Sequence, residues 1–227
     1  MQTITHHLMT TLVILLVVSC NSHADFKHRI ESTWDNLTRG PLYFQSQLGF
    51  SSETDFAEAV IFFDYEKSEE RNFLTSLSFG RKISDTMLVW PFEVVAYASL
   101  QRFNERGIQK DIWGTAVFAK AYSNFNIGSV PFRLGFGHGL SYVTRLPAAE
   151  VREFLPDRSE KLIYHMDYSL QVSLLHLMSP GQKRKPKGVE DIFIGYGIWH
   201  RSTLFGLLGE ISGGTNYMGL SIETVLK

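Results

Sequence analysis

Two residues of this sequence, His200 and Ser202, have types and a spacing suited to nucleophilic chemistry. Residues two apart on a β-strand project from the same side, with backbones about 6.6 to 7 Å apart. An imidazole at position 200 can therefore lean toward the hydroxyl at position 202 and act as its base. This is the arrangement of an activated nucleophile.

Such a pair requires a third group that keeps the imidazole in one tautomer. Two residues downstream could supply it. Asn216 shares the parity of the apolar residues of the last predicted strand, whereas Glu210 lies in the preceding loop. The register favours Asn216, although Glu210 would supply the negative charge that better stabilises an imidazolium.

These residues continue a pattern of alternating side chains. The face shared by Ile192, Ile194, Tyr196 and Ile198 is extended by the histidine and the serine. Three other segments, 92–101, 132–142 and 162–174, place mainly apolar residues at even positions and mainly polar residues or glycine at odd ones. Alternation with a period of two predicts β-strands.

The length of these strands indicates where the apolar face points. They run to about 11 to 13 residues, which is double the usual globular length and close to what a tilted strand needs to cross a bilayer. The opposite face, with glycines at 135, 137 and 139, suits a lumen wall better than an oily core. The sequence therefore predicts an all-β, antiparallel up-and-down transmembrane barrel with its apolar rows facing lipid.

Eight strands are predicted, near 57–66, 72–82, 87–103, 111–122, 130–143, 161–177, 190–202 and 216–226, with a further strand-like piece at 42–50. Bacterial barrels prefer an even number of strands with both termini in the periplasm. The connections at 144–160 and 203–215 are then extracellular. The connection at 178–189 is periplasmic.

The start of the sequence predicts export. Residues 1–24 contain an apolar run too short to span a bilayer, followed by small residues, as in a secretory signal. Cleavage after Ala24 is favoured over acylation of Cys20 as a lipoprotein. Residues 25–40 are expected to form a short helix or periplasmic segment, with Phe26, Ile30, Trp34 and Leu37 at helical spacing, and residues 41–227 the barrel in a bacterial outer membrane.

Composition excludes several classes of function. A net charge of −1 provides no basic field for nucleic acid. The single cysteine, Cys20, excludes a disulfide framework and a cysteine-based metal site within one chain. No metal or organic cofactor is implied by the candidate residues.

The end of the chain resembles a known family. His200-Arg201-Ser202, a glycine-bearing loop and Gly214-Thr215-Asn216 look like the His-x-Ser signature of the PagL-type lipid A 3-O-deacylases, also described as acyloxyacyl hydrolases. The rest of the chain resembles them only in architecture. The resemblance implies an eight-stranded outer-membrane barrel that removes an ester-linked acyl chain from lipid A or a related lipid. His200 would be the base and Ser202 the nucleophile, with Asn216 nearest the position of the acid.

Other interpretations of the same residues remain open. Trp199, His200 and Tyr217 could form a polar and aromatic collar, which would make the chain a non-enzymatic structural or binding barrel of the outer membrane. His165 and Asp167 share a face with a serine and could form a second catalytic set, but a lumen is ordinarily lined by such residues. A third alternative is an exported lipocalin-like lipid binder, in which the apolar faces would line a cavity.

Overall fold

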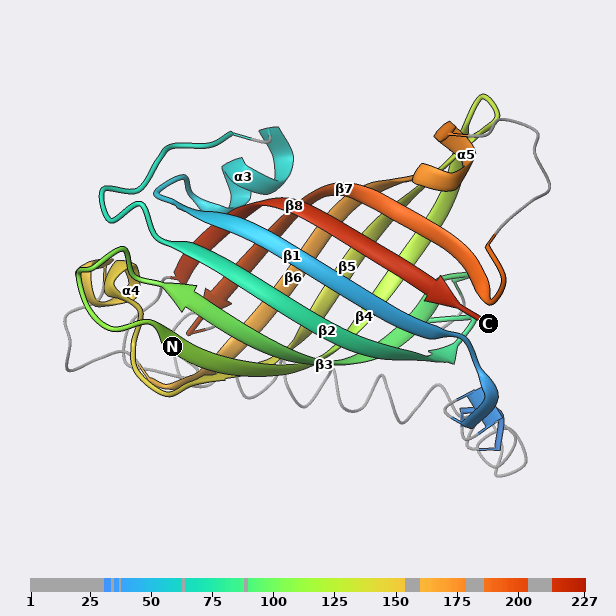
Figure 1. Ribbon diagram of the computed structural model, residues 1–227, viewed down its shortest axis with the longest axis horizontal. Coiled ribbons are helices and arrows are strands. Elements are labelled where there is room, and N and C mark those ends of the chain that lie inside the picture. Colours follow the sequence, from blue (N-terminus) through green and yellow to red (C-terminus); the bar gives the residue numbers. More distant parts are fainter. Residues whose placement is uncertain are drawn as a thin grey trace, which may run out of the picture.

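The chain forms a closed barrel of eight antiparallel strands in which neighbours in sequence pair and the last strand pairs with the first (Figure 1). The predicted fold class is therefore confirmed. The computed structural model describes residues 31–33, 35–36, 38–62, 64–87, 90–153, 160–178, 186–203 and 214–227. The predicted signal segment, with its alternatives at Ala24 and Cys20, lies outside these residues, as does Glu210.

The strands are β1 (Leu42–Ser52), β2 (Phe73–Ser84), β3 (Glu93–Asn104), β4 (Ile112–Ile127), β5 (Val130–Val143), β6 (Leu162–Ser173), β7 (Val189–Ser202) and β8 (Gly214–Leu226). Three short helices lie in the connections: α3 (Phe56–Phe62), α4 (Ala148–Glu153) and α5 (Leu174–Met178). Residues 31–33, 35–36 and 38–39 are also helical. No helix in the described part of the chain has the length and apolar character needed to cross a membrane.

One predicted strand is wrong. The segment expected as a strand at 57–66 contains helix α3, and the strand-like piece at 42–50 is β1. Asp55 explains the difference, because its carboxylate accepts a hydrogen bond from the amide of Ala57 at 2.8 Å and so caps the helix. The strand predicted at 161–177 likewise ends at Ser173, where α5 begins. The count of eight strands is unaffected.

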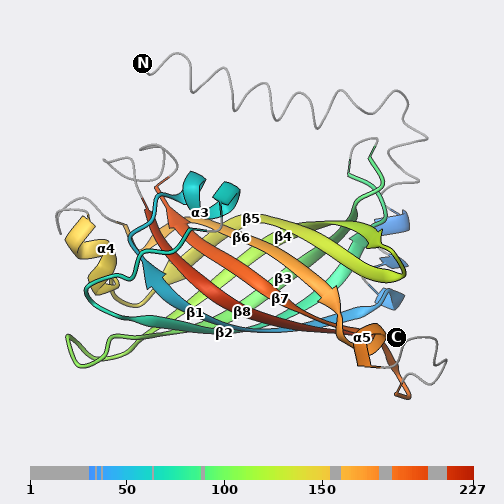
Figure 2. The ribbon, with the colours of Figure 1, turned by 90° about the horizontal axis from the view of Figure 1, so that it is seen from above.

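The connections separate into two groups at opposite ends of the barrel. Helices α3 and α4 lie at one end, and α5 lies at the other end with the C-terminus (Figures 1 and 2). The predicted extracellular connections, 144–160 and 203–215, join strands at the α3–α4 end. The connection from β6 to β7, expected on the other side, joins strands at the end that carries α5.

The apolar rows face outward, as predicted. Phe79, Val117 and Leu100 are 66%, 60% and 50% exposed, whereas Lys120 and Asp167, at positions of opposite parity on their strands, are fully buried. The lipocalin-like alternative is therefore wrong for this chain, since it requires the apolar rows to line an interior cavity.

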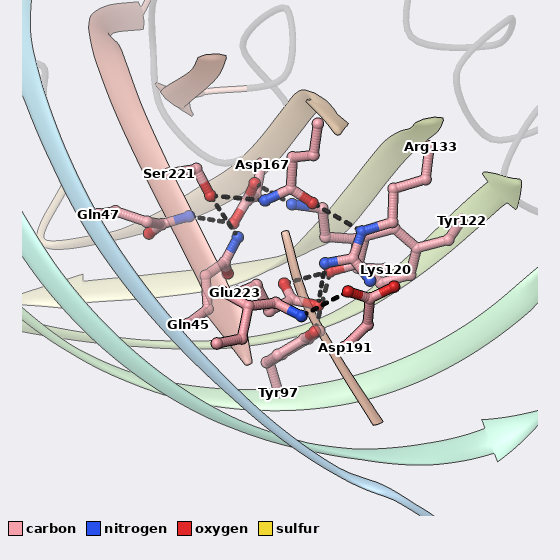
Figure 3. Close-up of polar contacts among 12 residues, drawn as sticks. Gln45, Gln47, Tyr97, Lys120, Tyr122, Arg133, Asp167, Asp191, Ser221 and Glu223 are labelled. Atoms are coloured by element: carbon pink, nitrogen blue, oxygen red, sulfur yellow. Dashed lines mark hydrogen bonds and ion pairs between the residues drawn. The ribbon is translucent and has the colours of Figure 1, made fainter. Parts of the chain in front are cut away.

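The interior holds ion pairs (Figure 3) together with two clusters of buried apolar and aromatic side chains, one around Phe118 and one around Trp199. Lys120 Nζ lies 2.6 Å from Asp167 Oδ1, and Arg133 Nη2 lies 2.7 Å from Glu223 Oε1. The Tyr122 hydroxyl donates to the same glutamate at 2.7 Å. Because buried charges are tolerated only when paired and hydrogen-bonded, these contacts fix four strands relative to one another across the lumen.

The polar residues of β6 belong to this interior and do not form a second catalytic set. Asp167 is held by Lys120 and by Gln47, whose amide donates at 2.7 Å. His165 packs against Phe118, and neither of its ring nitrogens has a hydrogen-bond partner among the described residues. His165 and Asp167 therefore line the interior of the barrel, as expected for lumen residues.

Removing one partner of an interior ion pair should destabilise the barrel. We expect Lys120→Met to lower the free energy of unfolding by about 3 to 5 kcal/mol, because Asp167 would remain as an uncompensated buried charge. The measurement is denaturant unfolding of the purified barrel in lipid vesicles. Arg102→Met is the control, since its pair with Asp111 is partly exposed and should contribute at most about 1 kcal/mol. Equal losses in the two variants would contradict the prediction.

Candidate active site

Three of the four predicted residues lie at the end of the β7–β8 pair opposite the C-terminus (Figure 1). His200 is the cross-strand partner of Asn216, and Ser202 is the partner of Gly214. The three polar side chains have the outward parity of Leu220, which is 46% exposed. They are nevertheless only 4 to 8% exposed themselves. Another part of the chain must therefore cover them.

A chain of two hydrogen bonds fixes the histidine tautomer. His200 Nδ1 lies 2.7 Å from Asn216 Oδ1, and the Asn216 amide nitrogen donates to the Thr54 carbonyl, also at 2.7 Å. A carbonyl can only accept, so the asparagine presents its nitrogen to Thr54 and its oxygen to the histidine. Nδ1 therefore carries the proton, and Nε2 is left with a lone pair that can accept one.

The absence of a side chain at Gly214 leaves space for the imidazole. A Cβ atom built at this position would overlap Cε1 and Nε2 of His200. The basic edge of the ring thus lies over the cross-strand neighbour of Ser202. The structure therefore brings His200 and Asn216 into direct contact and directs Nε2 toward the end of the strand that carries the serine.

Helix α3 is the element that covers the site (Figures 1 and 2). The Phe56 ring stacks on the His200 imidazole with centroids 4.4 Å apart and an interplanar angle of 29°. Ala59, in the same helix, packs with Ile198 and Met218 on the barrel wall. Asp55, between Thr54 and Phe56, caps the helix by accepting a hydrogen bond from the Ala57 amide. The sequence interpretation missed these residues because it placed a strand here, although Asp55 before an apolar run is a helix-start signal.

The residue between the histidine and the serine faces the interior. Arg201 donates through Nε to Glu150 of α4 at 2.5 Å and through Nη1 to the Ser141 hydroxyl. It therefore anchors α4 to the wall behind the site. Trp199 and Tyr217 also lie inside, 1% and 0% exposed, so the predicted aromatic collar is wrong for these two residues.

A second tether connects α4 to the β1–β2 connection. Arg152 lies 2.7 Å from Glu53 and 2.7 Å from Glu70, and 3.3 Å from Glu69. A hydrogen bond from the Glu69 amide and the contact with the Arg152 guanidinium together lower the pKa of Glu53. This tether holds the segment that begins at Glu53 and continues into α3.

An apolar cavity of about 200 Å³ lies on the outer surface next to the site. Ile198, two residues before the histidine, forms part of its wall, and Val60 contributes from α3. Its other lining residues come from β5, β6 and β7: Leu134, Gly135, Phe136, Tyr168, Ser169, Leu170 and Tyr196. Within the described residues, no cluster of three or more His, Cys, Asp or Glu could hold a metal ion.

Filling the space at Gly214 should displace the imidazole. We expect Gly214→Ala to break the His200–Asn216 hydrogen bond, because the new methyl group would overlap both the imidazole and the Arg201 carbonyl oxygen and one of them must shift. Side-chain ¹⁵N NMR of histidine-labelled protein would report loss of the Nδ1-protonated tautomer. The His176 signal of the same sample is the internal control, since that residue lies in α5 at the opposite end of the barrel (Figure 1). An unchanged His200 signal in Gly214→Ala would contradict the placement of the ring.

The tether at Glu53 should weaken in acid. Its pKa is lower in the folded protein than the ordinary value of 4.5, so its stabilising effect is complete above that value and is lost as the pH falls through the folded pKa. We expect hydrogen exchange in residues 53–72, corrected for intrinsic rates, to accelerate below about pH 4.5. Glu53→Gln should remove part of this dependence. An identical pH response in that variant would exclude Glu53 as its source.

A solved structure is similar to this chain in fold. No family model matches the sequence, and no curated protein matches it. The crystal structure of Neisserial surface protein A (NspA) is similar in fold, with a TM-score of 0.46 and 15% sequence identity over 83% of this chain and 99% of that chain.

Proposed function

We propose that this protein is an outer-membrane esterase that removes an ester-linked acyl chain from lipid A or a related membrane lipid. The observation that carries the proposal is the hydrogen bond between His200 and Asn216 on the outer wall, with Nε2 directed toward the end of β7 that carries Ser202. The PagL-type His-x-Ser resemblance assigns these residues the roles of base, orienting group and nucleophile.

The distribution of side chains supports a location in the outer membrane. Strands of 11 to 16 residues carry apolar side chains outward and ion-paired ones inward. A tilted strand of about 9 to 11 residues crosses the hydrocarbon layer of a bilayer, so each strand is long enough. Export by the predicted signal in residues 1–24 would deliver the chain to that membrane.

The proposed reaction proceeds through an acyl-enzyme. Ser202 Oγ attacks the ester carbonyl while His200 Nε2 takes its proton, and the histidine then returns the proton to the departing alcohol oxygen. Water attacks the acyl-serine with His200 again as base, which releases the fatty acid and restores the serine. Asn216 keeps Nδ1 protonated throughout, in the role that asparagine has in Cys-His-Asn proteases.

The apolar cavity beside the site supports an acyl substrate. It opens on the outer wall, is lined almost entirely by aliphatic and aromatic groups, and includes Ile198, two residues from the proposed base. A lipid already in the leaflet could place one chain there without leaving the membrane. The ester would then lie near Ser202, at the end of the strand.

Replacing the proposed nucleophile should abolish deacylation. We expect Ser202→Ala to fold as the wild type does and to lose at least about 10³-fold in rate, because no other group would form the acyl-enzyme. Mass spectrometry of lipid A from cells producing each variant is the measurement. Ser123→Ala is the matched control, since it removes an outward-facing serine at the other end of the barrel. Lipid A that still loses an acyl chain with Ser202→Ala would refute the assignment.

The alternative is a non-enzymatic structural or binding barrel of the outer membrane. The low exposure of His200 and Ser202, 6% and 8%, and the neutral Asn216 favour it. Its distinguishing result is unchanged lipid A composition whether the cell produces the wild type, Ser202→Ala or no protein.

A further inference from the structure

The segment from Thr54 to Phe56 contacts both members of the proposed base assembly. The Thr54 carbonyl accepts from the Asn216 amide at 2.7 Å, and the Phe56 ring covers one face of the His200 imidazole at 4.4 Å. We infer that Phe56 is a positioning residue of the proposed esterase. It holds the imidazole in the plane in which Nδ1 meets Asn216 and Nε2 is directed toward the end of β7 that carries Ser202. This inference rests on the proposed function.

The hydrogen bond to Asn216 cannot set that plane by itself. The terminal torsion of a histidine side chain is broad, so one contact at Nδ1 leaves the ring free to tilt about it. The Phe56 ring, whose plane is inclined by 29° to the imidazole, limits this tilt on the side that it covers. It also excludes water from the side of the imidazole that it covers.

Phe56 is itself fixed by its surroundings. Its ring lies 5.4 Å from that of Tyr168 on β6, and it packs against the cluster of Ala59, Ile198 and Met218. Thr54, two residues earlier, is held by its carbonyl contact with Asn216 and by a hydrogen bond from the Ser52 hydroxyl at 3.0 Å. Phe56 thus contacts the barrel wall as well as the histidine.

A leucine at position 56 would keep an apolar side chain beside the histidine without a flat face that can stack on the imidazole.

The test compares Phe56→Leu and Phe56→Tyr with wild type, using purified protein and lipid A in mixed micelles. We expect Phe56→Leu to lower kcat on the order of 10²-fold with little change in KM, since a misplaced base slows the chemical step. Phe56→Tyr should restore kcat, because it keeps the flat ring. Phe62→Leu is the control, an exposed residue of the same helix.

Wild-type kcat in Phe56→Leu, or equal losses in Phe56→Leu and Phe62→Leu, would overturn the inference. A second readout does not depend on activity. In ¹⁵N NMR spectra of histidine-labelled protein, we expect His200 as a single Nδ1-protonated tautomer in the wild type and as a tautomer average in Phe56→Leu. Identical spectra would overturn the positioning role even if the wild type is active. An inactive wild type with the expected spectral change would instead refute only the proposed function.

Discussion

Apolar side chains on the outside of a closed barrel force the polar side chains of the same strands into a space without bulk water. A charge there is stable only beside its counter-charge. The pairs Lys120–Asp167 and Arg133–Glu223 meet this requirement, and they join β4 to β6 and β5 to β8 across the lumen. The rest of the structure depends on this constraint, because it makes the wall a rigid support for groups on its outer surface.

The candidate site lies on the outer surface of this wall. Outward parity places His200 and Asn216 opposite each other on paired strands, while Arg201 between the histidine and the serine turns inward and anchors α4. Alternation along one strand therefore serves two purposes. The outward face carries the residues of the proposed chemistry, and the inward face fixes the strand that bears them.

The connection between β1 and β2 covers the histidine, which the strands of the wall cannot do. A strand offers its side chains only neighbours in the sheet, and these leave the upper face of an imidazole open. Helix α3 closes that face with Phe56, and the Thr54 carbonyl orients the asparagine. The tether from Arg152 to Glu53 links this cover to α4 and hence to the wall.

The sequence by itself determined the barrel and the register of the site, because a period of two over long segments assigns every side chain to one wall face. It therefore placed His200, Ser202 and Asn216 on a common outer face. Only the tertiary structure decided that residues 56–62 form a helix over the histidine and that the Thr54 carbonyl orients the Asn216 amide. These features depend on contacts between distant segments, since Thr54 and Asn216 are 162 residues apart, and the alternation of side chains along one strand cannot predict them.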